Sequence, residues 1–243
     1  MNPREITTFE LHPGRVIGGK YVVDSLLGAG WEGEVYLVEE RRTRGSRAAK
    51  LFFPYRNDRD RAVEFYARKL EALRDCPILI SYHHTETLRC FGTTVTALIS
   101  EYVDGVILGD DIKSRRGKRI PEYEALHILY NLASGLEQIH ARQEYHGDLH
   151  SGNVLVRRRG VHFDVKLVDL YDLGRSSKAH ARKDIIDLIR IFYDMLGGQP
   201  CYRNLRAEMK YIICGLKHTL ILDRFPTVSR LREHLDSFEW DNG

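Results

Sequence analysis

The stretch HGDLHSGN, residues 146–153, places an aspartate five positions before an asparagine in a loop with two glycines. A carboxylate in such a loop can accept a proton from a hydroxyl group, and a carboxamide oxygen can bind a hard metal ion. Asp148 and Asn153 are therefore candidates for catalysis and metal binding. The alternative is a surface turn with incidental polar residues. Because a predicted helix ending LEQIHAR enters the loop and the β-branched run NVLV leaves it, we favour the functional interpretation.

A glycine-rich turn supplies a second candidate. Gly28, Gly30 and Gly33 lie in GAGWEGEV, which ends at Val35. In a dinucleotide-binding loop a helix would follow, and its N-terminus would receive the phosphates. Here another predicted strand follows, so we expect a flap between antiparallel strands. Glycines leave backbone N–H groups accessible, and such groups can bind a polyphosphate.

Lys50 is a third candidate, in the run RAAKLFF. A lone lysine on a strand usually points to water. Apolar neighbours on both sides indicate a buried strand instead, where an unpaired ammonium group is costly. A phosphate partner would remove that cost, so we interpret Lys50 as a phosphate ligand near the glycine turn.

The elements that carry these candidates fall into two parts. Up to residue 103, the pattern predicts strands over 20–30, 33–40, 47–53 and 93–103 and one amphipathic helix over 58–76. We expect Asp58 or Asp60 to cap that helix and Pro77 to end it. From residue 104 the pattern predicts mainly helices, over 121–142, 182–198, 209–220 and 227–238, with short strands over 153–158 and 163–170. The predicted lobes are thus 1–103 and 104–243.

Composition narrows the class of protein. Of the 243 residues, 43% are hydrophobic and 29% are charged, which is typical of a globular protein, and the net charge of +3 does not favour nucleic acid. The basic clusters at 113–119 and 157–159 are solvated loop charge or bind an anionic partner. No apolar run reaches the roughly 20 residues of a membrane span, and the first residues lack a signal-peptide pattern. Four cysteines without CxxC spacing predict free thiols in the cytoplasm. The oligomeric state is not predicted.

Taken in order, the motifs GAGWEGEV, AAK, EYVDG, HGDLHSGN, DLY and DIIDLIRIFYDML resemble the protein kinase superfamily over roughly residues 14–238. The opening LHPGRVIGGKYVVDSLLGAG is similar to bacterial serine/threonine kinases. The loop HGDLHxGN is more similar to small-molecule phosphotransferases of the aminoglycoside and choline type. The resemblance implies an α+β, bilobal, kinase-like fold with ATP between a β-rich N-lobe, which has one helix, and a mainly helical C-lobe.

The resemblance assigns ATP binding to the first lobe. Lys50 matches the lysine that holds the α- and β-phosphates. Ser100 matches the gatekeeper position, and the backbone of Glu101 and Val103 matches the hinge that hydrogen-bonds adenine. The implied ATP-binding set is Gly28, Gly30, Gly33, Val35, Lys50, Glu101 and Val103.

The resemblance assigns catalysis and metal binding to the second lobe. Asp148 matches the catalytic aspartate that accepts or orients the substrate hydroxyl, and Lys50 acts with it. Asn153 and Asp169 match the ligands of Mg²⁺, which prefers hard oxygen donors. We expect these four side chains to converge in one crevice.

Three departures concern regulation. Gly147 stands where many regulated protein kinases carry an arginine that pairs with a phosphorylated activation loop. Only 15 positions separate Asp169 from Asp184, the apparent start of a buried helix, so the activation segment is shortened. DLY replaces the family's DFG, with Leu170 available for the phenylalanine's apolar role. These departures predict activity without loop phosphorylation.

Two further departures concern the site itself. The family register places Tyr66 where a helix glutamate would pair with the strand lysine. Glu64 or Glu71 could serve in a shifted helix, or both are exposed carboxylates. His150 replaces a lysine and either contacts the γ-phosphate or caps the loop.

The predicted function is that of an ATP- and Mg²⁺-dependent phosphotransferase acting on a hydroxyl group, as a protein serine/threonine kinase. One alternative is a small-molecule kinase, for which this chain has little spare length to form an acceptor pocket. Another is a pseudokinase that binds nucleotide or a partner without turnover.

Overall fold

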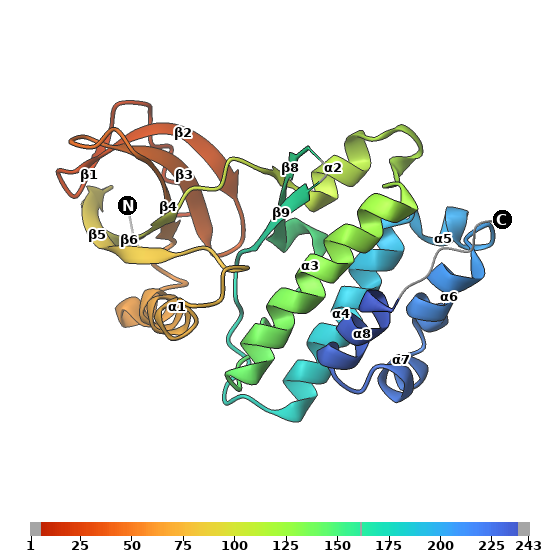
Figure 1. Cartoon of the computed structure of the whole chain (residues 1–243). Helices are drawn as coiled ribbons and strands as arrows, with labels where there is room; N and C mark the ends of the chain where they lie inside the picture. Colours follow the sequence, from red (N-terminus) through yellow and green to blue (C-terminus); the bar gives the residue numbers. More distant parts are fainter. Residues whose placement is uncertain (1–5, 161, 238–243) are drawn as a thin grey trace. The chain divides into compact units, whose positions relative to one another are not determined.

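The computed structural model describes residues 6–160 and 162–237, and the chain divides into two compact units (Figure 1). The first comprises Met1–Asp75 and Ile80–Val103, and the second comprises Cys76–Leu79 and Asp104–Gly243. Over the described residues, the first unit is a sheet with one α-helix, and the second is mainly helical. The predicted α+β class is therefore confirmed.

The first unit is built on an antiparallel sheet with the strand order β1-β2-β3-β4-β6-β5. Its strands are β1 Val16–Ile17, β2 Tyr21–Ala29, β3 Gly33–Glu40, β4 Ser46–Phe52, β5 Tyr82–Cys90 and β6 Thr93–Glu101. Strands β2, β3 and β4 form the predicted meander around the glycine turn, and β6 is the predicted fourth strand. The sequence pattern does not predict β1, which has only two residues, or β5, whose run YHHTETLRC is mostly polar.

The sheet curls so that its end strands, β1 and β5, contact each other. Residues 6–11 pack into this curled sheet and bury Phe9. The buried carboxylate of Glu34 holds the segment, because it accepts hydrogen bonds from Thr8 Oγ1 at 2.8 Å and from the Phe9 N–H at 3.1 Å. The hydroxyl of Tyr36 donates to the same carboxylate. A charged group inside the sheet is thereby satisfied, and the start of β3 is fixed.

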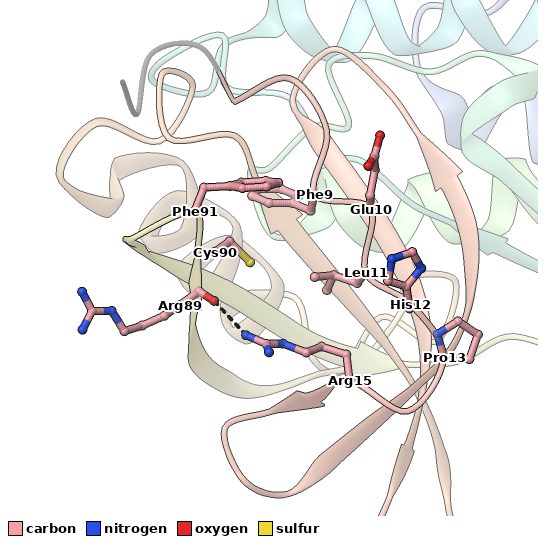
Figure 2. Close-up of a pocket in the computed structure, with 9 residues that line it drawn as sticks. All are labelled: Phe9, Glu10, Leu11, His12, Pro13, Arg15, Arg89, Cys90 and Phe91. Atoms are coloured by element: carbon pink, nitrogen blue, oxygen red, sulfur yellow. Dashed lines mark hydrogen bonds between the residues drawn. The ribbon is translucent and has the colours of Figure 1, made fainter. Parts of the chain in front are cut away.

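A surface pocket of about 410 Å³ lies where this N-terminal segment meets the β5–β6 turn (Figure 2). It is lined by residues 9–13 and 89–91 and by Arg15, whose guanidinium donates to the Arg89 carbonyl oxygen at 2.9 Å. The lining includes neither Lys50 nor the glycine turn.

Helix α1, Arg61–Ala72, follows a 3₁₀ turn and packs on the sheet through Val63, Tyr66 and Leu70. The predicted caps Asp58 and Asp60 are wrong. The side-chain oxygen of Asn57 accepts the hydrogen bonds from the first helical N–H groups, at 3.1 and 3.2 Å. Asp60 has φ 58° and makes no side-chain cap, because its left-handed backbone places it outside the usual capping geometry.

The second unit contains a three-stranded sheet in the order β7-β8-β9, formed by β7 Val106–Ile107, β8 Val154–Arg159 and β9 His162–Leu167. Its helices are α2 Leu108–Ser114, α3 Glu122–Ala141, α4 Lys178–Met195, α5 Gly198–Tyr202, α6 Ala207–Ile213, α7 His218–Arg224 and α8 Val228–Asp236. The core forms where α3 packs against α4 and α8 (Figure 1). The sequence pattern does not predict the short helices α2 and α5.

The predicted helix over 209–220 is wrong, because α6 and α7 are separate helices. Cys214, Gly215 and Leu216 have φ values of 54°, 57° and 57°, and this left-handed turn ends α6 before α7 begins. The predicted free thiols are found at all four cysteines. Within residues 6–160 and 162–237, no helix combines the length and apolar character needed to cross a membrane.

The basic clusters at 113–119 and 157–159 are extensively ion-paired. Glu124 binds Arg115 at 2.8 Å and Arg158 at 2.9 Å, and Arg159 binds Asp164 at 2.8 Å. These pairs neutralise part of the positive charge and favour its interpretation as solvated surface charge.

Candidate active site

Lys50 lies on β4, a central strand between β3 and β6, opposite Val35 on one side and Leu98 on the other. Its flanking residues Ala49 and Leu51 are fully buried, and the lysine side chain itself is 13% exposed. The predicted buried strand is therefore confirmed, and the ammonium group reaches only limited water.

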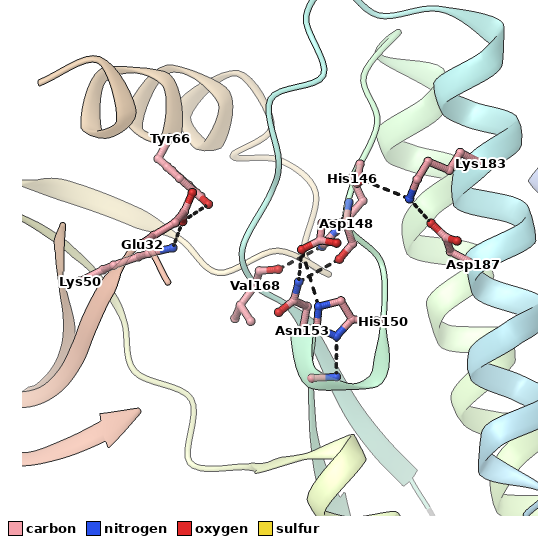
Figure 3. A network of polar contacts seen from close by, with 12 residues as sticks. Glu32, Lys50, Tyr66, His146, Asp148, His150, Asn153, Val168, Lys183 and Asp187 are labelled. Carbon is pink, nitrogen blue, oxygen red and sulfur yellow. Dashed lines mark hydrogen bonds and ion pairs between the residues drawn. The ribbon is translucent and has the colours of Figure 1, made fainter. Parts of the chain in front are cut away.

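The partner of Lys50 comes from the glycine turn. Its Nζ lies 2.9 Å from Oε2 of Glu32, and the hydroxyl of Tyr66 donates to the same oxygen at 2.8 Å (Figure 3). The ammonium group also lies 4.4 Å from the centre of the Tyr66 ring. Sequence reasoning missed Glu32, although it stands inside the quoted motif GAGWEGEV.

The two helix glutamates weighed as partners are exposed surface carboxylates. Glu64 pairs with Arg68 at 2.5 Å, one turn along α1. Glu71 pairs with Arg74 at 3.1 Å. Tyr66 occupies the buried face of the helix instead, as the sequence register predicts.

The glycines of the turn serve different purposes. A Cβ atom at Gly33 would lie 1.9 Å from the carbonyl oxygen of Leu51, so only glycine fits between β3 and β4. A Cβ atom at Gly28 or Gly30 would meet nothing within 4 Å. Gly33 is thus required by packing, whereas Gly28 and Gly30 leave open backbone near the turn.

The predicted adenine-binding segment ends the first unit. Ser100 is buried, and the N–H of Glu101 donates to the Ser81 carbonyl oxygen at 2.8 Å. The Glu101 carboxylate accepts a bond from the Ser81 N–H at 3.1 Å. This pairing fixes the backbone that leads to Val103.

In the second unit, Asp184 on α4 anchors the start of the HGDLHSGN loop. Its fully buried carboxylate accepts hydrogen bonds from the N–H groups of His146 at 2.8 Å and Gly147 at 2.9 Å, and the His140 ring bonds to it at 3.0 Å. Burial opposes the charged form, but the hydrogen bonds from His140, Gly147 and His146 outweigh it and lower the pKa of Asp184.

Asp148 and Asn153 face each other across this loop. The side-chain amide of Asn153 donates to the Asp148 carbonyl oxygen at 2.8 Å and approaches its carboxylate at 3.4 Å (Figure 3). Asn153 is buried, whereas the side chain of Asp148 is 48% exposed. The Asp148 carboxylate is therefore accessible to a molecule that approaches from solvent, while hydrogen bonds fix the loop that carries it.

The side chain of His150 caps the loop. Its Nδ1 accepts a hydrogen bond from the Gly152 N–H at 3.0 Å. The other ring nitrogen, Nε2, therefore carries the proton in the neutral ring and lies 3.6 Å from the Asp148 carboxylate.

The segment around Asp169 is bonded to the same loop on both sides. The Val168 N–H donates to the Asn153 carbonyl oxygen at 3.0 Å, and the Tyr171 N–H donates to that of His146 at 2.9 Å. Asp169 itself has φ 57°, a left-handed conformation that aspartate tolerates better than most residues. The structure thus brings the segments of Asp148, Asn153 and Asp169 together in one unit, and Lys50 belongs to the other.

A family model described as the protein kinase domain matches residues 21–213, which include every one of these positions. The chain belongs to the protein kinase family. Members of this family are phosphotransferases in which positioning and charge neutralisation carry most of the catalysis.

Named relatives and a solved structure agree with this assignment. PknA of Corynebacterium glutamicum, a serine/threonine-protein kinase, is 27% identical over 157 residues, which cover 63% of this chain and 32% of the relative. Nek11 of Homo sapiens, also a serine/threonine-protein kinase, is 27% identical over 157 residues, covering 62% and 24%. The kinase chain thus spans about a third or less of these two curated relatives.

The kinase domain of Mycobacterium tuberculosis PknI is similar in structure, with a TM-score of 0.67 and 23% identity over 93% of this chain and 97% of that one. This likeness shows the fold.

The kinase chain has a short segment between Asp169 and α4, and Tyr145 holds it. The buried Tyr145 hydroxyl donates to the Gly174 carbonyl oxygen at 2.6 Å and accepts from the Leu173 N–H at 2.8 Å. Leu170 is buried, as the apolar role expected of it requires.

Gly147 has a steric reason to be glycine. Its φ is +88°, and a Cβ atom there would lie 2.9 Å from the Tyr171 carbonyl oxygen. An arginine at this position would therefore strain the loop that carries Asp148.

Proposed function

We propose that this chain is an ATP- and Mg²⁺-dependent protein serine/threonine kinase. The observation that carries the proposal is the loop anchored by Asp184, in which Asp148 is half-exposed beside Asn153 and the Asp169 segment. Membership of the protein kinase family also supports the proposal. Asp148 would accept or orient the proton of the acceptor hydroxyl.

The donor set fits a magnesium ion. The NH₂ group of Asn153 is turned toward Asp148, so its amide oxygen is the atom left to bind a cation. Asp169 would add a carboxylate. Mg²⁺ typically takes few protein oxygens and completes its shell with water and substrate phosphates. When bound, it would neutralise phosphate charge.

Nucleotide binding would fall to the first unit. Lys50 would hold the α- and β-phosphates, and the backbone at Gly28, Gly30 and Gly33, with Val35 beside it, would cover the nucleotide. The Glu101 N–H is already bonded to Ser81, so its carbonyl oxygen, together with the Val103 N–H, would serve adenine.

Two features support activity without phosphorylation of the short segment. Gly147 replaces the arginine that would read a phosphate, and Tyr145 already holds Leu173 and Gly174 in place. The resemblance of HGDLHxGN to small-molecule phosphotransferases keeps a small hydroxyl compound as a second acceptor class.

The test is transfer from γ-labelled ATP with Mg²⁺, with casein and histone as protein acceptors and kanamycin and choline as small ones. We expect label on protein, and we expect Asp148→Ala to reduce it at least about a hundredfold. Asp110→Ala removes an exposed aspartate of the same unit and serves as the matched control. Label on kanamycin or choline alone would favour the small-molecule class. Stabilisation by nucleotide without any transfer would indicate a binding protein.

A further inference from the structure

Helix α1 places Tyr66 where the resemblance to protein kinases leads us to expect a glutamate that pairs with the strand lysine. Tyr66 is 6% exposed and faces the sheet. The nearby carboxylates Glu64 and Glu71 point to solvent and pair with arginines. A carboxylate that does contact Lys50 comes from a different element.

This carboxylate belongs to Glu32, and backbone hydrogen bonds fix the position of the turn that carries it. The turn is closed by a hydrogen bond from the Gly30 N–H to the Gly33 carbonyl oxygen at 2.9 Å. The Glu32 carbonyl oxygen accepts a bond from the Phe53 N–H, also at 2.9 Å, directly after β4. The glycine turn is thus tied to the strand that carries Lys50.

One carboxylate oxygen serves two donors. Oε2 of Glu32 lies 2.9 Å from Lys50 Nζ and 2.8 Å from the Tyr66 hydroxyl (Figure 3). The side chains of Lys50 and Glu32 are only 13% and 17% exposed, so water screens the pair less than a surface ion pair. The Tyr66 ring lies within cation–π range of the same ammonium group, at 4.4 Å.

We propose that Glu32 is the positioning carboxylate of Lys50 and that Tyr66 couples helix α1 to it. The inference rests on the proposed ATP-dependent function. A lysine ammonium has three N–H donors, so Glu32 can hold one of them while others bind phosphate oxygens. In this chain the carboxylate comes from the glycine turn and not from the helix. The Tyr66 hydroxyl links the helix to the Lys50–Glu32 pair.

The first test is a double-mutant cycle on nucleotide affinity. The dissociation constant of fluorescent trinitrophenyl-ATP with Mg²⁺ is measured for the wild type, Glu32→Gln, Lys50→Met and the double variant. Because Glu32 acts through Lys50, we expect Glu32→Gln to weaken binding about fivefold to tenfold in the wild type and to have no effect in the Lys50→Met background. Glu64→Gln, an exposed carboxylate on α1, should leave affinity unchanged.

The second test is rescue. In the Glu32→Gln chain, Tyr66→Glu returns a carboxylate to the helix, and we expect it to restore most of the kcat/KM for ATP that Glu32→Gln removes. A general structural role for Glu32 predicts no such rescue. If the chain with both Glu32→Gln and Tyr66→Glu does not fold, as judged by its circular dichroism, the double-mutant cycle on affinity alone decides.

The outcomes separate this proposal from the proposed function. Equal weakening by Glu32→Gln in both backgrounds, or tighter binding because Glu32 competes with phosphate, would overturn the positioning role. A wild-type chain that binds the analogue and shows the coupling but transfers no phosphate would refute the proposed function and leave this proposal standing. A wild-type chain that does not bind the analogue would refute both.

Discussion

Asp184 illustrates how a single buried side chain can position a loop that carries other chemistry. Its two carboxylate oxygens receive the N–H groups of His146 and Gly147 and the ring of His140. Each bond to a charged acceptor is stronger than a neutral one, and together they offset the cost of burying the charge. Asp148 follows directly after these anchored residues, so its direction is set by a residue far along the chain.

We predict that Asp184→Asn lowers the free energy of unfolding at pH 7 by about 3 kcal/mol, because an amide NH₂ would face backbone donors. The folded state lowers the pKa of Asp184, so its stabilisation is present above the ordinary value of 3.8 and is lost as the pH falls through the folded-state pKa. Urea unfolding of both proteins should therefore show the difference shrinking below about pH 4. A difference that stays constant down to pH 2 would contradict this account.

At the residue scale, the sequence predicts chemistry where a motif fixes residue types at a fixed spacing. Asp148, Asn153 and Asp169 lie in segments that hydrogen bonds bring together. Glu32 could not be predicted in the same way, because a turn residue has no periodicity to show which way its side chain points. The signal that could have found it is an acidic residue in the glycine turn combined with a tyrosine at the helix position.

The side chain of Tyr145 holds the segment between Asp169 and α4 from outside it. Tyr145 donates to Gly174 and accepts from Leu173, and its ring lies 4.4 Å from that of His180 at the start of α4. Burial raises the pKa of Tyr145, so its hydroxyl stays protonated and can keep donating at neutral pH. We therefore expect Tyr145 to hold this segment without any modification of the chain.

We predict that Tyr145→Phe loosens this segment and lowers the free energy of unfolding by about 1–2 kcal/mol, because two hydrogen bonds are lost from a buried group. Hydrogen exchange over residues 172–177 should become faster, and phosphate transfer should fall. Phosphatase treatment of the wild type should leave its rate unchanged. Tyr193→Phe, which removes a hydroxyl bond to Gln199 on another part of the unit, is the matched control. Unaltered exchange in Tyr145→Phe would show that the segment is held by other contacts.

Elements with clear periodicity are predictable from this sequence, and those shaped by tertiary context are not. The strands around the glycine turn and helices α3 and α4 follow their hydrophobic patterns. The cap of α1 does not, because Asn57 lies farther upstream than the two aspartates that fit the usual capping position. The turn at Cys214–Leu216 contains only one glycine as a sequence signal. The run over 209–220 therefore resembles one helix in sequence, although it forms two.

At the scale of the whole molecule, the chain does not finish one unit before starting the other. Cys76–Leu79 belongs to the second unit, and the chain then returns to the first at Ile80. Leu79 forms a parallel bridge with Leu167, and the Leu167 N–H donates to the Ile78 carbonyl oxygen at 2.7 Å. This short crossing adds a strand-like contact beside β9.

The predicted boundary at residue 103 places residues 76–79 in the first lobe. Apolar residues such as Ile78 and Leu79 are expected to be buried, but their pattern does not indicate in which of the two cores. The composition change near residue 104 is visible, since strands give way to helices there. A four-residue excursion between two units has no such signature. The unit to which residues 76–79 belong can be recognised only from the residue against which they pack.

That residue is Gly135 in the middle of α3. Two opposing effects on the free energy of unfolding can be predicted for its replacement by alanine. Replacing glycine by alanine in a helix normally stabilises by about 1 kcal/mol. Here a Cβ atom at Gly135 would lie 2.4 Å from Cγ1 of Ile78. We therefore expect Gly135→Ala to destabilise by about 1–3 kcal/mol in urea unfolding, since the packed core cannot yield freely.

The sign should reverse when the obstacle is removed. Ile78→Ala alone should cost about 2–4 kcal/mol, because it leaves a cavity beside α3. In that background the added methyl group of Gly135→Ala has room, so helix propensity should dominate and the second substitution should stabilise by about 1 kcal/mol. If Gly135→Ala instead stabilises the wild-type chain, Ile78 does not pack tightly on α3, and the assignment of residues 76–79 to the second unit loses one of its packing contacts.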